Sequence, residues 1–144
     1  MKLINEKAKF NYELGERIET GIVLTGSEVK SVKLGQIDMT PAHVRAQSSV
    51  HGGQSELWVV GLHIYPYKHA DNTNYDPTRS RKLLLHQREI LELLGKMRTG
   101  RLMLVPTAMY TKEGKIKLEI ALARGKKKYE KREVIKKRDL AREM

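Results

Sequence analysis

The sequence predicts a small, mainly β protein in which about six antiparallel strands close into a barrel, with two or three short helices and a basic C-terminal tail. Its 144 residues, of which 40% are hydrophobic, are enough for one domain with one core. Short runs of alternating or β-branched apolar residues recur between turn-forming residues, a pattern typical of antiparallel strands. Basic residues dominate the end of the chain, so we predict a barrel over 1–123 and a tail over 124–144.

A strand and a capped helix are predicted first. Residues 14–24, LGERIETGIVL, contain a β-branched run that favours a strand. Thr25 followed three residues later by Glu28 forms a capping box, in which each residue satisfies a backbone donor at the start of a helix. Gly35 is placed to end this two-turn helix in a left-handed conformation.

Two more strands and a polar loop follow. The patterns over 42–48 and 56–64 predict strands that are joined through Gly52 and Gly53. Residues 68–81, KHADNTNYDPTRSR, are polar and rich in turn formers. A loop of this length is either functional or disordered.

A helix and a hairpin complete the predicted barrel. Apolar residues at helical spacing predict a helix over 86–97. Two alternating runs flank the sequence KEGK, and this arrangement predicts a hairpin with Gly114 at a positive φ.

The tail is strongly basic and has no apolar face. Between 124 and 144, ten Lys or Arg stand against four acidic residues, which gives +6 of the net charge of +11. Its apolar residues do not recur every three or four positions, which argues against a helix docked on the core or on a membrane. Like charges four residues apart, such as Arg132 and Lys136, destabilise a free helix. We expect a tail that is disordered alone and becomes helical on a polyanion.

The composition argues against an active site. The absence of Cys removes disulfides, thiolate catalysis and Cys-based zinc sites. The five His are scattered, and the stretch from His69 to Asp76 lacks the Gly and the terminal Glu of a calcium loop. The sequence contains neither a P-loop nor a nucleophile elbow. We therefore expect no enzyme activity, no metal and no cofactor.

Charge and hydropathy indicate the partner and the compartment. No apolar run is long enough for a signal peptide or a membrane span, so we expect a soluble, cytoplasmic protein with no membrane partner. The net charge of +11 indicates a polyanion, with nucleic acid as the first alternative and an anionic membrane surface as the second. The missing apolar stripe in the tail favours nucleic acid.

Four motifs stand in one order along the chain: ETGIVLTGSEVKSVKLG, DPTRSRKLLLHQREI, GKIKLEIALARGKKKYEKRE and IKKRD. Together they resemble the small protein B (SmpB) family, the bacterial partner of transfer-messenger RNA (tmRNA), from about residue 5 to residue 142. The resemblance implies an oligonucleotide-binding (OB) barrel that has no catalytic activity and acts as a monomer, one per tmRNA. It implies an adaptor that binds the tRNA-like domain of tmRNA and delivers it to stalled ribosomes for trans-translation. The tail would then occupy the decoding centre and the empty mRNA channel, against small-subunit rRNA.

The resemblance also implies which residues face RNA. In the body these are Glu19, Lys30, Leu84 and His86, with Arg81 and Lys82 as phosphate contacts and Asn5, Lys7 and Lys9 as weaker candidates. In the tail, the implied ribosome contacts are Gly125, Lys126, Lys127, Tyr129, Lys131, Arg132, Lys136 and Lys137. Two of these residues have alternatives. Leu84 could belong to the core, and Glu19 could orient a neighbouring Lys or Arg instead of accepting from a base or a ribose 2′-OH.

The chain departs from the family pattern in a few places. Phe10 and Tyr129 stand where the family has His, although both keep a stacking face. Glu130 replaces a frequent Asp, and we interpret the turn around 47–55 as longer than the family's and the tail as ending early. Two other functions stay open: a generic ribosomal or single-strand RNA-binding OB module without a rescue role, and an RNA-processing enzyme, which the lack of a general base pair or metal ligands disfavours.

Overall fold

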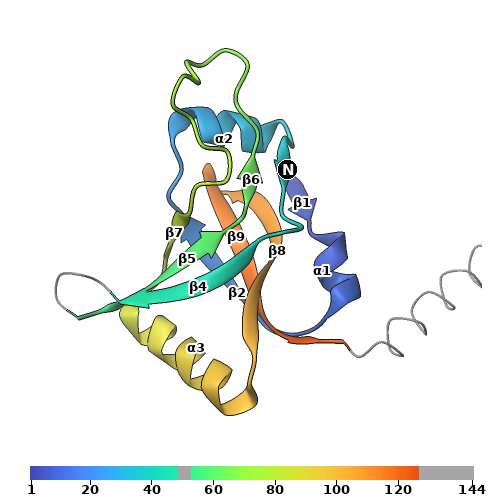
Figure 1. Cartoon of the computed structure of the whole chain (residues 1–144), viewed down its shortest axis with the longest axis vertical. Helices are drawn as coiled ribbons and strands as arrows, with labels where there is room; N and C mark the ends of the chain where they lie inside the picture. Colours follow the sequence, from blue (N-terminus) through green and yellow to red (C-terminus); the bar gives the residue numbers. More distant parts are fainter. Residues whose placement is uncertain (49–52, 127–144) are drawn as a thin grey trace, which may run out of the picture.

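A computed structural model describes residues 1–48 and 53–126, and this part of the chain has nine strands and three helices (Figure 1). The elements, in chain order, are β1 (Lys2–Ile4), α1 (Glu6–Asn11), β2 (Tyr12–Ile22), α2 (Gly26–Lys33), β3 (Ile37–Asp38), β4 (His43–Ser48), β5 (Ser55–Val60), β6 (His63–Ile64), β7 (Arg81–Leu84), α3 (Gln87–Gly100), β8 (Met103–Lys112) and β9 (Lys115–Gly125). The prediction of a mainly β protein is confirmed.

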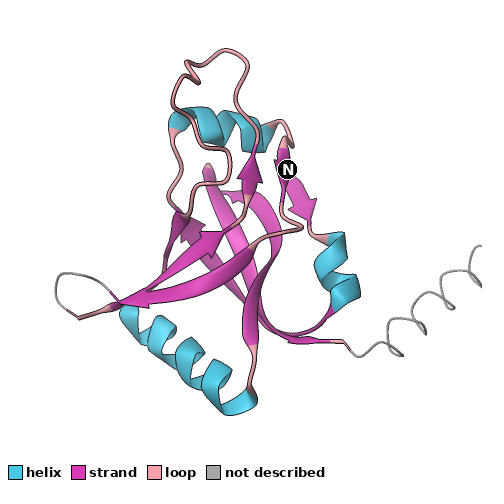
Figure 2. Ribbon diagram, viewed as in Figure 1, coloured by secondary structure: helices cyan, strands magenta, loops and turns pink. Residues whose placement is uncertain are grey.

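Seven strands pair in one antiparallel sheet, and the pairing returns on itself. The order is β1-β8-β4-β5-β7-β2-β9, with an additional pairing between β8 and β9 (Figure 2). Six strands therefore pair in a ring that runs from β8 through β4, β5, β7, β2 and β9 back to β8. The pairing of β4 with β8 is the shortest part of this ring, because it consists of Val44 opposite Leu104. The short strands β3 and β6 form a second sheet.

Apolar side chains from the ring of strands form the main core. Its most deeply buried members include Leu57, Val59, Leu83, Leu104, Met109, Leu118 and Ile120. Helices α2 and α3 lie at opposite ends of the molecule, and α1 lies at its side (Figure 1). At one end α3 buries Ile90 and Leu93, and at the other α2 buries Val32. Both helices thus pack on the same core.

The helix cap, the turns and the elements predicted from short-range sequence patterns are confirmed. The hydroxyl of Thr25 accepts from the backbone N–H of Glu28 at 3.3 Å, and the Glu28 carboxylate accepts from the Thr25 N–H at 2.9 Å. Gly35 follows this helix with φ +74°, as predicted. Glu113 and Gly114, with φ of +51° and +77°, form the two-residue turn between β8 and β9. The predicted strand over 14–24 and helix over 86–97 correspond to β2 and α3.

Other predictions need correction. The strand predicted over 56–64 is interrupted, because Gly61 adopts φ +80° and separates β5 from β6. A Cβ at Gly61 would lie 2.9 Å from the Pro41 carbonyl oxygen, so the backbone itself fills the space of a side chain. The patterns also do not predict β1, α1, β3 or β7. The described part of the chain therefore has nine strands where about six were predicted. At the C-terminal end of the described residues, β9 continues through Arg124 and Gly125.

A buried ion network joins α2 to the segment before β7. The Glu28 carboxylate, 1% exposed, accepts from the Arg81 guanidinium at 2.5 and 2.8 Å and from Arg79. Arg81 is fully buried, and its remaining donors bind the carbonyl oxygens of Leu62 and Pro77. The Tyr75 hydroxyl also donates to Glu28, at 3.1 Å. The predicted polar loop is therefore tied to a helix that lies about fifty residues earlier in the chain.

These contacts decide the charge of Glu28. Burial alone would raise the pKa of its carboxyl. Hydrogen bonds from Arg79, the Thr25 N–H and Arg81 outweigh that effect and lower the pKa to about 2. Glu28 is therefore ionised at neutral pH, and it compensates the buried charge of Arg81.

Replacement of Glu28 by Gln should lower the free energy of unfolding by about 3–5 kcal/mol, because it leaves the buried Arg81 guanidinium without a counter-charge. Urea unfolding followed by circular dichroism measures this change. The matched control is Glu16→Gln, which removes the exposed ion pair of Glu16 with Lys96 and should cost at most about 1 kcal/mol. An equal effect of the two variants would contradict the role of Glu28.

The same variant should also change the pH dependence of stability. The pKa of Glu28 in the folded protein lies below its ordinary value of 4.5, so the unfolded chain binds more protons between about pH 4.5 and pH 2. The wild-type protein loses the contribution of Glu28 as the pH falls through this range, and Glu28→Gln should show a shallower loss. Parallel curves for the two proteins would mean that Glu28 does not titrate in this window.

Candidate nucleic-acid interface

Leu84 is an apolar side chain that the fold turns toward solvent. It lies on β7 and is 54% exposed, whereas Leu83 beside it is 2% exposed and belongs to the core. Leu84 lies opposite Gly21 of β2. A Cβ at Gly21 would come within 3.1 Å of the Leu84 Cβ, so Gly21 leaves the space that Leu84 occupies. The alternative that Leu84 belongs to the core is therefore wrong.

A cavity of about 380 Å³ lies beside Leu84. Its lining residues come from β2, α2, β7 and the β8–β9 hairpin: Gly21, Ile22, Leu24, Val29, Leu84, Gly114, Lys115, Ile116 and Lys117. Most of these residues are apolar or lack a side chain, and two are lysines. An apolar surface with adjacent cations suits a nucleobase and its phosphate.

Glu19 lies on the same side of β2 as Gly21, two residues away. Its carboxylate accepts from the Lys112 ammonium at 3.1 Å. This hydrogen bond lowers the pKa of Glu19, to which the charges of Lys112 and Lys117 also contribute. Burial and the charge of Glu19 raise the pKa of the neighbouring Tyr110. Of the two alternatives for Glu19, the orientation of a lysine is the one found in the free protein.

Strand register extends this surface across several strands. Tyr110 lies opposite Lys117 and Lys2, and Lys82 lies opposite Trp58. Opposed residues share one side of a sheet. We define the outer strand face as the set Lys2, Glu19, Gly21, Trp58, Lys82, Leu84, Tyr110, Lys112 and Lys117. It combines two aromatic rings, one exposed leucine and several lysines.

Six members of the outer strand face follow from strand register and were not predicted: Lys2, Gly21, Trp58, Tyr110, Lys112 and Lys117. Tyr110 and Lys112 lie outside the four quoted motifs, and Lys117 lies in one of them but received no role. The signal in the sequence is the alternation of KIKLEI, which predicts that every second side chain of β9 faces outward. Only the register of β9 against β2 and β8 shows that these three residues surround Glu19.

Lys82, Lys30 and His86 keep accessible positions near this face. Lys82 is 43% exposed and lies 3.4 Å from Glu56. Lys30 is an exposed residue of α2 that follows Val29 of the cavity. His86 is exposed at the start of α3, where its backbone N–H donates to Glu89 at 3.1 Å. These three side chains fit the predicted RNA contacts.

The prediction that Arg81 contacts a phosphate is wrong. Its side chain is fully buried, and its guanidinium donates to Glu28 and to backbone carbonyl groups. A phosphate outside the protein cannot reach this group. The physical reason is the alternation of β7, which points Arg81 and Leu83 inward and Lys82 and Leu84 outward.

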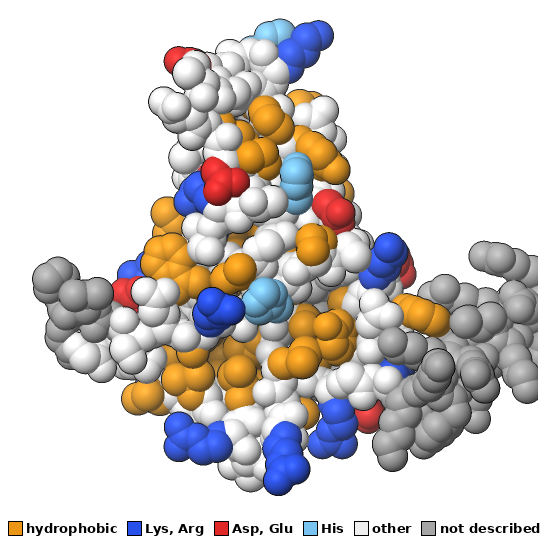
Figure 3. Space-filling view, in the orientation of Figure 1, with side chains coloured by type: hydrophobic (Ala, Val, Ile, Leu, Met, Phe, Trp, Pro, Cys, Tyr) orange, Lys and Arg blue, Asp and Glu red, His pale blue; other side chains and the backbone are white. Residues whose placement is uncertain are grey.

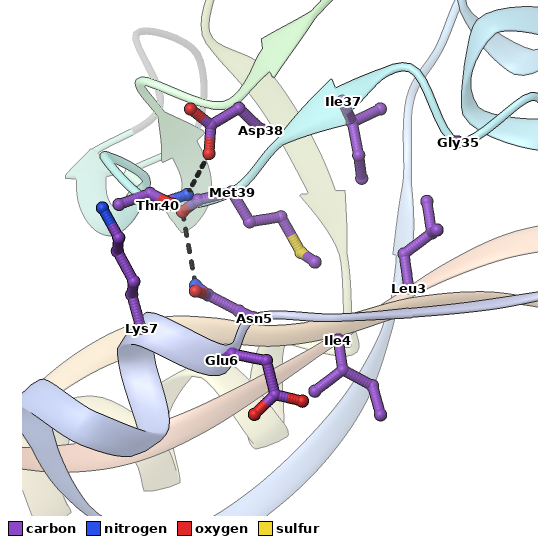
Figure 4. A pocket seen from close by; sticks show the side chains of 10 residues that line it. All are labelled: Leu3, Ile4, Asn5, Glu6, Lys7, Gly35, Ile37, Asp38, Met39 and Thr40. Atoms are coloured by element: carbon purple, nitrogen blue, oxygen red, sulfur yellow. Dashed lines mark hydrogen bonds between the residues drawn. The ribbon is translucent and has the colours of Figure 1, made fainter. Parts of the chain in front are cut away.

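Lys7 and Lys9 lie elsewhere, on α1. Lys7 lies on the rim of a second cavity, of about 280 Å³, between the start of α1 and the β3 segment (Figure 4). Within this cavity Asn5 is buried, and its amide donates to the carbonyl groups of Met39 and Pro106. Asn5 thus supports the fold. Lys126 joins this region, because its ammonium donates to the Lys9 carbonyl oxygen at 3.1 Å.

Of the predicted tail contacts, Gly125 and Lys126 lie in the described part of the chain, at the end of β9 and just after it. Lys127, Tyr129, Lys131, Arg132, Lys136 and Lys137 lie outside the described residues, as does most of the turn between β4 and β5. Within residues 1–48 and 53–126 no group of three His, Asp or Glu could hold a metal ion. In the same part of the chain no helix is long and apolar enough to cross a membrane.

Comparison with known proteins shows the family of the chain. The family model described as SmpB protein matches residues 3–144. The chain is 49% identical over 140 residues to the SsrA-binding protein of Persephonella marina, covering 97% of this chain and 88% of that protein. It is 46% identical to the SsrA-binding protein of Mycolicibacterium paratuberculosis, covering 97% and 79%.

A solved structure agrees with the sequence matches. It is described as "tmRNA-SmpB: a journey to the center of the bacterial ribosome" and superposes with a TM-score of 0.68 at 42% identity. The match covers 88% of this chain and 85% of the solved chain. With a family model that spans nearly all residues, the chain belongs to the SmpB family.

Proposed function

We propose that this protein is a non-catalytic adaptor that binds the tRNA-like domain of tmRNA and delivers it to stalled ribosomes for trans-translation. The observation that carries the proposal is the match, over 97% of the chain, to proteins that are named for binding SsrA RNA. The solved relative, whose description names tmRNA and the ribosome, supports the same partners. The protein acts in the cytoplasm, as a monomer with one copy per tmRNA.

The body supplies a shape that suits this role. We infer that the six strands of the ring form a closed barrel of the OB type, for which the pairing of β8 with both β4 and β9 is the support. The outer strand face, with Lys30 and His86 beside it, binds the tRNA-like domain. Its apolar cavity and aromatic rings contact bases or riboses, and its lysines contact phosphates.

The tail supplies most of the charge. Its sequence supports a segment that is disordered in the free protein and becomes helical in the decoding centre and the empty mRNA channel, where rRNA phosphates neutralise its basic residues. Gly125, Lys126, Lys127, Tyr129, Lys131, Arg132, Lys136 and Lys137 are the proposed ribosome contacts. The end of β9 and Lys126, which is held against α1, fix where this segment leaves the body.

Purification of the tagged protein from its cells, with sequencing of the RNA that accompanies it, tests the proposal. One dominant RNA with a tRNA-like end is the expected result. A mixed population of RNAs would favour a generic RNA-binding module without a rescue role.

Leu84→Ala should weaken binding of the tRNA-like RNA about 10- to 100-fold, because an exposed leucine loses the surface that it buries against RNA. Gel shift or filter binding measures the affinity. The matched control is Leu91→Ala on α3, since Leu91 is 56% exposed and lies outside the outer strand face. We expect both variants to unfold at nearly the wild-type temperature. Equal binding by the two variants would remove Leu84 from the interface.

Replacement of Lys131 and Arg132 together by Ala should leave binding of tmRNA intact and abolish tagging of peptides on stalled ribosomes. Ordering a segment costs about 1–2 kcal/mol per residue, so the tail needs many charge-assisted contacts to fold on the ribosome. A reconstituted tagging assay measures the loss, with Arg88 and Arg98 of α3 replaced together as a control for charge. Normal tagging by the Lys131 and Arg132 variant would show that these residues are dispensable.

A further inference from the structure

The segment between β6 and β7 is long and polar, yet its backbone is held by specific contacts. The Tyr75 hydroxyl donates to the Ile64 carbonyl at 2.8 Å and to Glu28 at 3.1 Å. The Asn72 amide donates to the carbonyl groups of Tyr67 and Ala70 at 2.9 and 3.1 Å. Together with the arginines bound to Glu28, these bonds fix the turn that begins at Tyr67. These bonds argue against the alternative of a disordered loop.

This fixed turn carries aromatic and basic side chains. The Tyr67 ring lies edge-on to the ring of His69, with centroids 5.5 Å apart. The ammonium of Lys30, from α2, lies 5.4 Å from the centre of the Tyr67 ring. Lys68 and His69 are exposed, and Figure 3 shows a histidine and a basic side chain together at this end of the molecule.

The charges of this group are available to a ligand. Within the described part of the chain, neither Lys30 nor Lys68 forms an ion pair. The nearest acidic residue of the turn, Asp71, accepts from Thr73, whose hydrogen bonds lower the pKa of the Asp71 carboxyl. In contrast, Lys82, Lys96 and Lys112 each lie beside a glutamate.

We propose that Lys30, Tyr67, Lys68 and His69 form a contact site for unpaired nucleotides of RNA, which we call the turn site. The ring of Tyr67 stacks on a base, and the two lysines bind phosphates. The ammonium of Lys30 covers the ring in the free protein, so a phosphate that draws Lys30 away exposes an aromatic face. The inference rests on the proposed function and extends its RNA surface.

Position and chemistry favour RNA over a protein partner. Val29, which lines the cavity beside Leu84, directly precedes Lys30, so α2 connects the turn site to the outer strand face. Aromatic rings with unpaired cations bind single-stranded nucleic acid without a strict sequence requirement. The bonds from Asn72 and Tyr75 hold the site before RNA arrives, which reduces the entropy lost on binding.

Binding of a transcript of the tRNA-like end of SsrA RNA, with 5-iodouridine at its unpaired positions, tests the turn site. Tyr67→Leu should weaken binding about 5- to 100-fold, as expected for one base–aromatic stack, and Tyr67→Phe should stay within about twofold of wild type. Lys68→Ala should lower the log–log salt slope by about 0.7–0.9, whereas Arg98→Ala, at the α3 end, should leave it unchanged. Irradiation should crosslink the wild-type complex at Tyr67.

The outcomes separate the two proposals. If the wild-type protein fails to bind the transcript, the proposed function is wrong. If it binds, but Tyr67→Leu binds equally and the crosslinks lie away from 67–69, only the turn site is overturned. Thermal unfolding of each variant shows whether it folds, and the crosslink in the wild-type protein decides the matter even where Tyr67→Leu does not.

Discussion

The buried carboxylate of Glu28 is the interaction on which the arrangement of the surface depends. One negative charge faces two guanidinium groups, and Arg81 has no solvent to stabilise it. Burial of a charge is costly unless a partner and hydrogen bonds compensate it, and for Arg81 the Oε2 atom of Glu28 and the carbonyl oxygens of Leu62 and Pro77 do so. The network joins α2, the segment after β6 and the start of β7, which are far apart in the sequence.

The orientation of Arg81 has consequences along β7. Because side chains alternate along a strand, an inward Arg81 requires that Leu83 face the core and that Lys82 and Leu84 face outward. Gly21 on the neighbouring strand then leaves room for Leu84. The same network holds α2, so Val29 has a fixed position in the cavity beside this leucine. The buried ion pair of Arg81 with Glu28 thus determines which residues of the RKLLLH motif are accessible at the surface.

Sequence reasoning succeeded where the interaction is local and failed where the partner is distant. The capping box of Thr25 and the turn at Gly114 involve residues two or three positions apart, so the pattern alone contains them. The sequence predicts Arg81 to be a surface cation, because its partner Glu28 lies 53 residues earlier in the chain. The break at Gly61 likewise depends on the backbone of Pro41. Lys112 and Lys117 reach the interface only through strand register, which the sequence does not specify.

The distribution of charge differs between the body and the tail, and this difference supports the separate roles proposed for them. On the outer strand face, Lys82 and Lys112 lie beside glutamates, which weaken their attraction for phosphates over a distance. For the proposed RNA contact there, shape and apolar contact would matter more than charge, as suits a folded RNA with a defined surface. The tail holds +6 of the net charge of +11 in 21 residues, with far fewer acidic residues to offset it. Such a segment gains most where phosphates surround it on several sides, as in a channel lined by RNA. In the proposed function, a body whose lysines lie beside glutamates therefore suits binding of the folded tmRNA. A tail with a large excess of basic residues suits binding of ribosomal RNA.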